Sequence, residues 1–141
     1  MKLSLMLVIA VALMACRPSP PTEKPETTAL AFFQAIYIEH DVAAATQLVD
    51  PAIAELLQHY RLASQIQRNL LGLNLTEVNV GIAEVDIDFF RRQTDEVNVL
   101  IKLTGYRNGQ FIMDDRRVQL TRLNDRWLIT ELYADPFNSN G

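Results

Sequence analysis

The sequence predicts an α+β fold in which helices come first and an antiparallel sheet follows. Between residues 25 and 71, apolar residues recur with the spacing of amphipathic helices; after Gly72 they alternate with polar residues. Short turn signals separate the later segments, which favours a meander of about four antiparallel strands. Helices that precede such a sheet and pack on it define the α+β class.

The first 15 residues have the pattern of a secretory signal peptide. Lys2 supplies one positive charge, and residues 3–15 carry none. This run is shorter than the roughly 20 apolar residues that span a membrane. We therefore expect a leader at 1–15, a tether at 16–24 and a single domain at 25–141. The alternative is a buried helix of a soluble domain, which the prolines that follow at once disfavour.

The segment "LMAC", which ends at Cys16, resembles the lipobox of bacterial lipoproteins. The resemblance implies cleavage before Cys16, a lipid on its thiol and an acyl chain such as palmitate on the new amino group. Two or more acyl chains anchor a protein stably, whereas one anchors it only marginally. Arg17 follows where an aspartate would imply inner-membrane retention, so the resemblance implies the outer membrane, facing the periplasm. The alternative is a signal peptide with an incidental cysteine.

The chain without its leader is acidic and has no further cysteine. Removal of Lys2 changes the formal charge from -4 to about -5. We therefore expect no nucleic-acid partner, because such partners require a basic surface. Because Cys16 is the single cysteine, stability must come from a packed core and not from disulfides. Residues 17–24 are rich in proline and predict a semi-rigid tether of about 25 Å.

Three helices are expected before the sheet. Pro25 suits the first helical position, and Glu26 suits the positive end of the helix dipole. Asp41 is a suitable N-cap for a short second helix, and Asp50 before Pro51 is one for a third. Core contacts from the third helical segment are expected at Ile53, Leu56, Leu57, Tyr60, Leu70 and Leu71.

Four strands are expected after the helices. In the first, the apolar alternation changes phase, which predicts a bulge near Ala83–Glu84. Asn108–Gly109 is a strong hairpin signal between the second and third strands. A turn at Asn124–Asp125 leads into the last strand. The sheet should therefore be a simple meander.

The segment "PETTALAFFQAIYIEHDVAAATQLVDP" is similar to the opening of nuclear transport factor 2-like domains, also called cystatin-like. "NDRWLI" resembles their closing Gly-x-Trp-x-Ile hairpin, with Asp125 in place of glycine. The resemblance covers nearly all of residues 25–134 and is closest to small bacterial envelope lipoproteins of unknown function. It implies a cone between helices and a curved sheet. It implies little about function, because these are packing motifs.

The same resemblance raises the question of catalysis, because the family includes ketosteroid isomerase and polyketide cyclases. Asp86 and Asp88 alternate with apolar residues, so both are expected to face water. His40 and His59 have no second histidine or cysteine at a metal-ligand spacing. We therefore expect no metal, no cofactor and a non-catalytic role. The alternative is a small-molecule-binding protein or enzyme that uses the cone.

The segment "MDDRRV" places charges on both faces of the third strand. Side chains two residues apart share a face, so Asp114 pairs with Arg116, and Asp115 pairs with Arg117. A regular strand must send one pair inward. We expect the first pair to do so, because Val118 shares its parity.

Asp114, Arg116 and Tyr60 are therefore the candidate lining of a polar pocket in the cone. An ion pair in an apolar cone is costly unless it is satisfied or binds something. The alternative is an exposed strand end, or a bulge that turns both pairs toward solvent.

The outer face of the sheet is the candidate interface. If Trp127 and Ile129 face inward, then Leu128 and Leu132 point outward together with Leu100. A sheet face with exposed leucines favours a partner or self-association surface, and the resemblance implies dimers through this face. The expected partners are the bilayer, through the acylated cysteine, and a second copy or an envelope protein at the sheet. An accessory subunit of an envelope secretion or assembly complex is a further alternative.

Overall fold

The computed structural model describes residues 24–86 and 95–133. In chain order its elements are α1 (Pro25–Gln34), the π-helix η1 (Ala35–Glu39), α2 (Val42–Thr46), α3 (Pro51–Tyr60), α4 (Ala63–Asn69), β1 (Thr76–Asp86), β2 (Glu96–Arg107), β3 (Gln110–Leu123) and β4 (Arg126–Leu132). The strands form one antiparallel sheet in the order β1-β2-β3-β4. The predicted α+β class and meander are confirmed.

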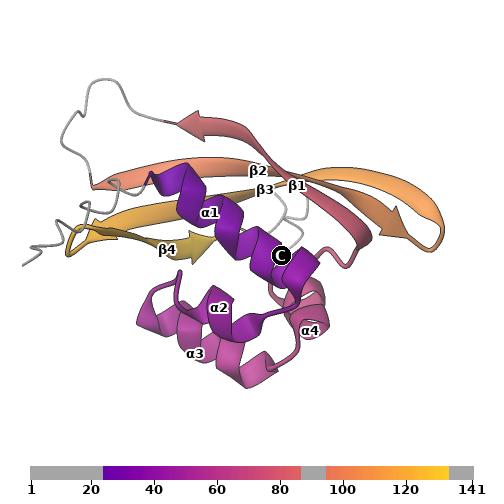
Figure 1. The fold of residues 1–141 in the computed structure, drawn as a ribbon, viewed down its shortest axis with the longest axis horizontal. Helices are drawn as coiled ribbons and strands as arrows, with labels where there is room; N and C mark the ends of the chain where they lie inside the picture. The colour runs from indigo at the N-terminus through magenta and orange to yellow at the C-terminus, as the bar shows by residue number, and fades with distance from the viewer. Residues whose placement is uncertain (1–23, 87–94, 134–141) are drawn as a thin grey trace, which may run out of the picture.

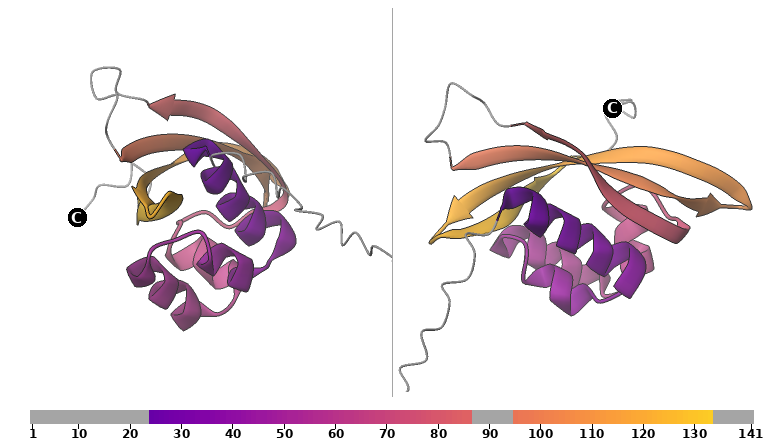
Figure 2. Two further views of the ribbon diagram at one scale, coloured as in Figure 1. Left: turned by 60° about the vertical axis from the view of Figure 1, so that its left-hand side comes forward. Right: turned by 45° about the horizontal axis from the view of Figure 1, so that its top comes forward.

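The helices all lie on one face of the sheet (Figure 1). The strands curve over them, and the hairpin that joins β2 to β3 extends past the helical layer (Figure 2). One continuous core lies between the two layers. Its largest buried side chains include Phe32, Phe33, Ile36, Leu57, Ile66, Ile101, Leu103, Leu120 and Ile129. Within the described residues, no helix is long and apolar enough to cross a membrane.

The predicted N-caps are confirmed. The Asp41 carboxylate accepts a hydrogen bond from the Ala44 backbone N–H at 3.0 Å, and Asp50 accepts one from that of Ile53 at 2.9 Å. Each bond satisfies an N–H group that the first helical turn leaves without a partner. These caps define where α2 and α3 begin.

The segment that we expected to form the third helix forms two helices, α3 and α4. α3 ends at Tyr60, Arg61 adopts a left-handed φ of 61°, and α4 begins at Ala63. No glycine or proline marks this break in the sequence, so periodicity alone did not reveal it. Leu56, which we expected in the core, is 44% exposed on α3.

Both predicted turns and the predicted bulge are present. Asn108 and Gly109 have φ values of 51° and 75°, which is the pattern of a tight hairpin turn. The register of β1 shifts between Ile82 and Glu84, where the bulge was expected. A further bulge, which we did not predict, shifts the pairing of β3 with β4 after Gln119.

The two edges of the sheet differ. The β4 edge is covered by the segment that leads into α3: the backbone N–H of Asp50 donates to Ile129 O at 2.9 Å, and that of Ile129 donates to Leu48 O at 2.9 Å. At the opposite edge, β1 pairs with β2 alone among the described strands and contains two bulges. Bulges discourage strand addition at an edge. Addition of a further strand is therefore disfavoured at both described edges of the sheet.

Candidate functional site

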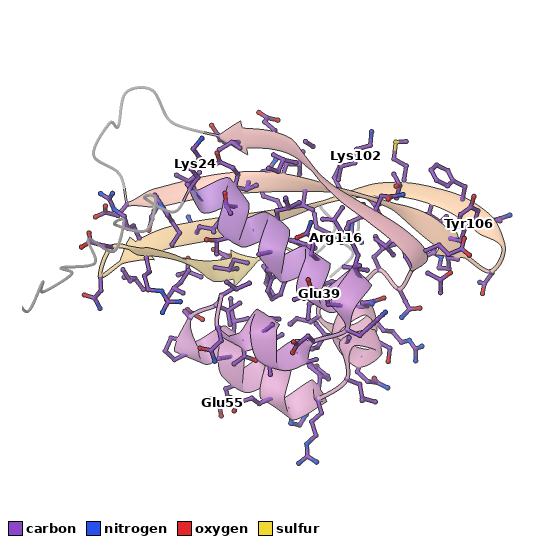
Figure 3. All side chains as sticks on the ribbon, viewed as in Figure 1. Lys24, Glu39, Glu55, Lys102, Tyr106 and Arg116 are labelled. Carbon is purple, nitrogen blue, oxygen red and sulfur yellow. The ribbon has the colours of Figure 1, made fainter. Side chains whose placement is uncertain are left out.

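Arg116 is buried between the sheet and the helices, on the face that alternation predicted (Figure 3). Its side chain is 2% exposed, and its Nε donates to Leu71 O at 2.7 Å. Nη1 donates to Asp115 O at 2.7 Å and lies 3.1 Å from Asp114 Oδ2. Nη2 donates to Gly72 O at 3.5 Å. The guanidinium is therefore satisfied by the protein itself.

Two further buried side chains bind the same connection between α4 and β1. The Tyr37 hydroxyl donates to Leu73 O at 2.6 Å. Gln67 Nε2 donates to Ile36 O at 3.1 Å, and its Oε1 accepts from the Leu75 backbone N–H at 3.3 Å. We call Tyr37, Gln67 and Arg116 the buried polar cluster. It satisfies backbone groups of residues 71–75 that would otherwise be buried without partners.

The environment of Tyr37 changes its acidity. Burial raises the pKa of the Tyr37 hydroxyl well above its usual value, because the phenolate would lose its hydration. The nearby Arg116 opposes this change, and the Asp114 carboxylate adds to it. The hydroxyl is therefore a stable hydrogen-bond donor at neutral pH and is poorly suited to act as a base.

The structure does not join the three candidate pocket residues. Asp114 and Arg116 form an ion pair, but no hydrogen bond or ion pair among the described residues connects either of them to Tyr60. Tyr60 is the last residue of α3, is half-buried against the core, and has its ring 5.3 Å from that of His59. The tyrosine whose pKa is affected by Arg116 and Asp114 is Tyr37, which is buried in the core, and not Tyr60. A ligand at Asp114, Arg116 and Tyr60 stays a prediction.

The remaining candidates for chemistry are dispersed. In the part of the chain that the structure describes, no three His, Cys, Asp or Glu side chains are grouped so as to hold a metal ion. His40 follows η1 with a φ of 54° and is exposed. Asp86 is exposed, as expected, whereas Asp88 and Cys16 lie outside the described residues.

On the outer sheet face, the three candidate interface leucines have different surroundings. Leu100 on β2 is half-buried. Leu128 on β4 is also half-buried and lies opposite Thr121 of β3. The prediction that Leu132 points outward is wrong. The unpredicted bulge in β4 places it opposite the fully buried Val118, and it packs against the core.

The outer face around Leu100 is hollowed and carries charges of opposite sign on its two sides. Glu84 and Asp86 of β1 line one side of a hollow of about 30 Å³, and Arg117 of β3 lines the other. Leu100 and Asn98 of β2 lie between them. We call these five residues the charged row. No ion pair within 24–86 and 95–133 joins Arg117 to either carboxylate.

Asn98 adds a second feature to the charged row. Its side-chain Oδ1 is buried and has no hydrogen-bond partner in the structure. A buried acceptor without a donor costs free energy, which a donor from another molecule would recover.

Strand register brings the charged row together. Glu84 and Leu100 pair across β1 and β2, and Leu100 and Arg117 pair across β2 and β3. The row is therefore an ordered cross-strand arrangement.

Comparison with known proteins finds similarity at the level of fold. No family model matches the chain, and no curated protein matches it. A solved structure of a SEC-C motif containing protein from Rhodopseudomonas palustris has a TM-score of 0.58 at 16% identity, covering 81% of this chain and 80% of that one. A variant of the NTF2 protein Rd1NTF2_05 has a TM-score of 0.52 at 12% identity, covering 76% and 93%. The fold is NTF2-like.

An NTF-2 like protein of unknown function from Shewanella oneidensis MR-1 is also similar, with a TM-score of 0.48 at 14% identity, and covers 79% of this chain and 100% of its own. In the NTF2-like fold of the present chain, the polar side chains on the inner face bind the connection between α4 and β1. The sequence did not reveal Tyr37 and Gln67 as members of this cluster, because each binds a backbone carbonyl that is distant in the chain, 36 and 31 residues away respectively. The opposite charges of Glu84 and Arg117 were visible in the sequence, but their adjacency depends on the β1 bulge.

Proposed function

We propose that this chain is a lipid-anchored, non-catalytic interaction module at the outer membrane, facing the periplasm, that associates through the outer face of its sheet. One observation carries the proposal: the charged row lies on a sheet face that no described helix covers (Figure 2). The buried polar cluster supports a non-catalytic role, because its polar groups bind backbone atoms of the fold.

The charged row favours a second copy of the chain as the partner. When two such sheets stack about a two-fold axis along β2, Leu100 meets Leu100 of the other copy. Each Arg117 then lies over the Glu84 and Asp86 side of the opposite sheet. An axis across the strands would instead place like charges together. Lys102, in the next row, lies opposite Asp115 of its own chain, which offsets its charge.

The anchor supports the same proposal. Lys24, where the tether enters the domain, lies on the other side of the molecule from Tyr106 at the β2–β3 hairpin (Figure 3). A tether of about 25 Å from an acylated Cys16 would keep each domain close to the bilayer. Confinement to one membrane surface raises the effective concentration of the copies. Even a modest interface at Leu100 would then favour association.

A charge-swap experiment tests this interface on the acylated full chain in detergent. We expect Arg117→Glu alone and Glu84→Arg alone each to weaken self-association at least tenfold, because like charges then meet. An equimolar mixture of the two variants should form a heterodimer, because opposite charges meet at both contacts. Sedimentation of the separate and mixed samples measures this.

Arg107→Glu is the matched control, because it makes the same charge change at the exposed hairpin. It should associate as the unaltered chain does. An unaltered chain that is monomeric would exclude the second copy as the partner. A mixture that stays monomeric, or an Arg117→Glu chain that dimerises normally, would show that the charged row does not form the contact. If the chain is monomeric but captures an envelope protein, and Leu100→Asp abolishes this capture, the chain is an interaction module whose partner is that protein and not a second copy.

The lipid anchor has its own test. We expect Cys16→Ser to abolish labelling by radioactive palmitate and to remove the chain from the outer-membrane fraction, because its hydroxyl cannot form the thioether. Arg17→Asp should keep the label but move the chain to the inner membrane. Metabolic labelling with membrane fractionation measures both. A Cys16→Ser chain that still carries label, or that stays in the outer membrane, would refute the anchor.

A further inference from the structure

The helical layer contains a groove that is independent of the sheet face. It has a volume of about 400 Å³ and is lined by Val42, Ala43, Thr46, Gln47, Gln58 and Arg61. Its size is within the range of small-molecule sites. α2 and α3, which supply most of its lining, form the part of the helical layer farthest from the sheet (Figure 1). A ligand here would therefore not compete with a partner at Leu100.

We propose that this groove binds a small organic carboxylate with a short apolar body, and that Arg61 recognises the carboxylate. Val42 and Ala43 supply an apolar wall for the body. Arg61 is the one charged residue among the lining side chains, and the lining has no acidic residue to neutralise it. A guanidinium pairs with a carboxylate in a planar, two-bond geometry.

Some of the other polar groups of the lining already form hydrogen bonds within the protein, and others are available to a ligand. The Thr46 hydroxyl donates to Val42 O at 2.8 Å, and the Gln47 backbone carbonyl accepts from Arg126 Nη2 at 3.2 Å. Among the described residues, the side chains of Gln58 and Arg61 make no hydrogen bond and no ion pair. Within this described lining the Gln47 side chain makes none either, so the donors available to a ligand lie on both the α2 and the α3 side of the groove.

The backbone at Arg61 is a second, independent observation. Arg61 has φ 61° and ψ −36°, a conformation that a residue with a Cβ adopts at a cost and that glycine adopts freely. Backbone strain of this kind is concentrated at ligand sites, where a particular side chain is needed despite the cost. At the wall of this groove, the residue in the strained position is the one that carries the positive charge.

Binding of N-acetyl-valine to the acylated full chain tests the proposal, with its neutral N-methylamide as the comparison ligand. We expect the acid to bind and the amide to bind at least tenfold more weakly. Arg61→Gln should weaken the acid at least tenfold. Arg61→Gly should weaken it equally while raising the melting temperature, because glycine relieves the strain. Isothermal titration and thermal unfolding measure these two effects.

Arg68→Gln is the matched control, because it removes an exposed arginine from α4 outside the groove. It should leave binding unchanged. The proposal is overturned if the unaltered chain does not bind the acid, if the acid and the amide bind equally, or if Arg68→Gln weakens binding as much as Arg61→Gln. Tighter binding of Gly-Gly-Val than of N-acetyl-valine would identify a peptide C-terminus as the source of the carboxylate. Equal binding of the two would identify a free acid as its source.

Discussion

Replacement of Arg116 by alanine is expected to lower the free energy of unfolding by about 3–5 kcal/mol, because two backbone carbonyls lose their donor, at about 1–3 kcal/mol each, and a cavity remains in the core. The side chain is 2% exposed and binds Leu71 O and Gly72 O. These acceptors are backbone carbonyls, so no second substitution can replace them by apolar groups. Arg116→Met should therefore also destabilise the chain, by about 1–3 kcal/mol for each carbonyl left without a donor.

Urea unfolding of the acylated chain in detergent measures this loss. Arg107→Ala, which removes an exposed arginine from β2, serves as the control and should change stability by about 0.5 kcal/mol or less. Hydrogen exchange gives a local readout: the amides of residues 71–75 should exchange faster in Arg116→Met than in the unaltered chain. If Arg116→Ala loses less than about 1 kcal/mol, the guanidinium does not hold this connection.

The second large effect is a decrease of stability at alkaline pH that depends on Tyr37. Its pKa in the folded chain is raised above the ordinary value of 10.0, first of all by burial. The folded chain therefore holds the phenol proton more tightly than the unfolded chain does. This stabilisation is complete below pH 10 and is lost as the pH rises from 10 toward the folded pKa, by about 1.4 kcal/mol per pH unit.

Tyr37→Phe should remove the part of this dependence that Tyr37 contributes. At pH 7 the variant should be about 1–3 kcal/mol less stable, because Leu73 O loses its donor. Above pH 10 the difference between the two chains should shrink. Tyr133 contributes in the same direction, because burial and its hydrogen bond to Glu131 raise its pKa, so Tyr133→Phe is measured beside it. A Tyr37→Phe chain with an unchanged alkaline slope would show that Tyr37 does not titrate on unfolding.

Local signals account for the parts of the fold that sequence analysis predicted. The caps at Asp41 and Asp50, the turn at Asn108–Gly109 and the β1 bulge each depend on a few neighbouring residues. Alternation along β3 likewise placed Arg116 inside. Such features follow from backbone preference and short-range hydrogen bonds, which a sequence displays directly.

Other features required contacts between distant segments. Leu132 turned inward because a bulge in β4 changed its phase, and the break at Arg61 has no glycine or proline to signal it. Tyr37 lies 36 residues from the carbonyl that it binds, so no local pattern could identify the pair.

The order of the elements, their caps and turns, and the face on which Arg116 lies can therefore all be predicted from the sequence. Contacts between distant segments are needed to show that this arginine is satisfied by backbone carbonyls, and that Glu84 and Arg117 flank Leu100 on an open face. The difference lies in the distance along the chain between interacting residues. Caps and turns are set by neighbours in the chain, whereas the partners of a buried charge and the charges on a sheet face are set by strand register and packing.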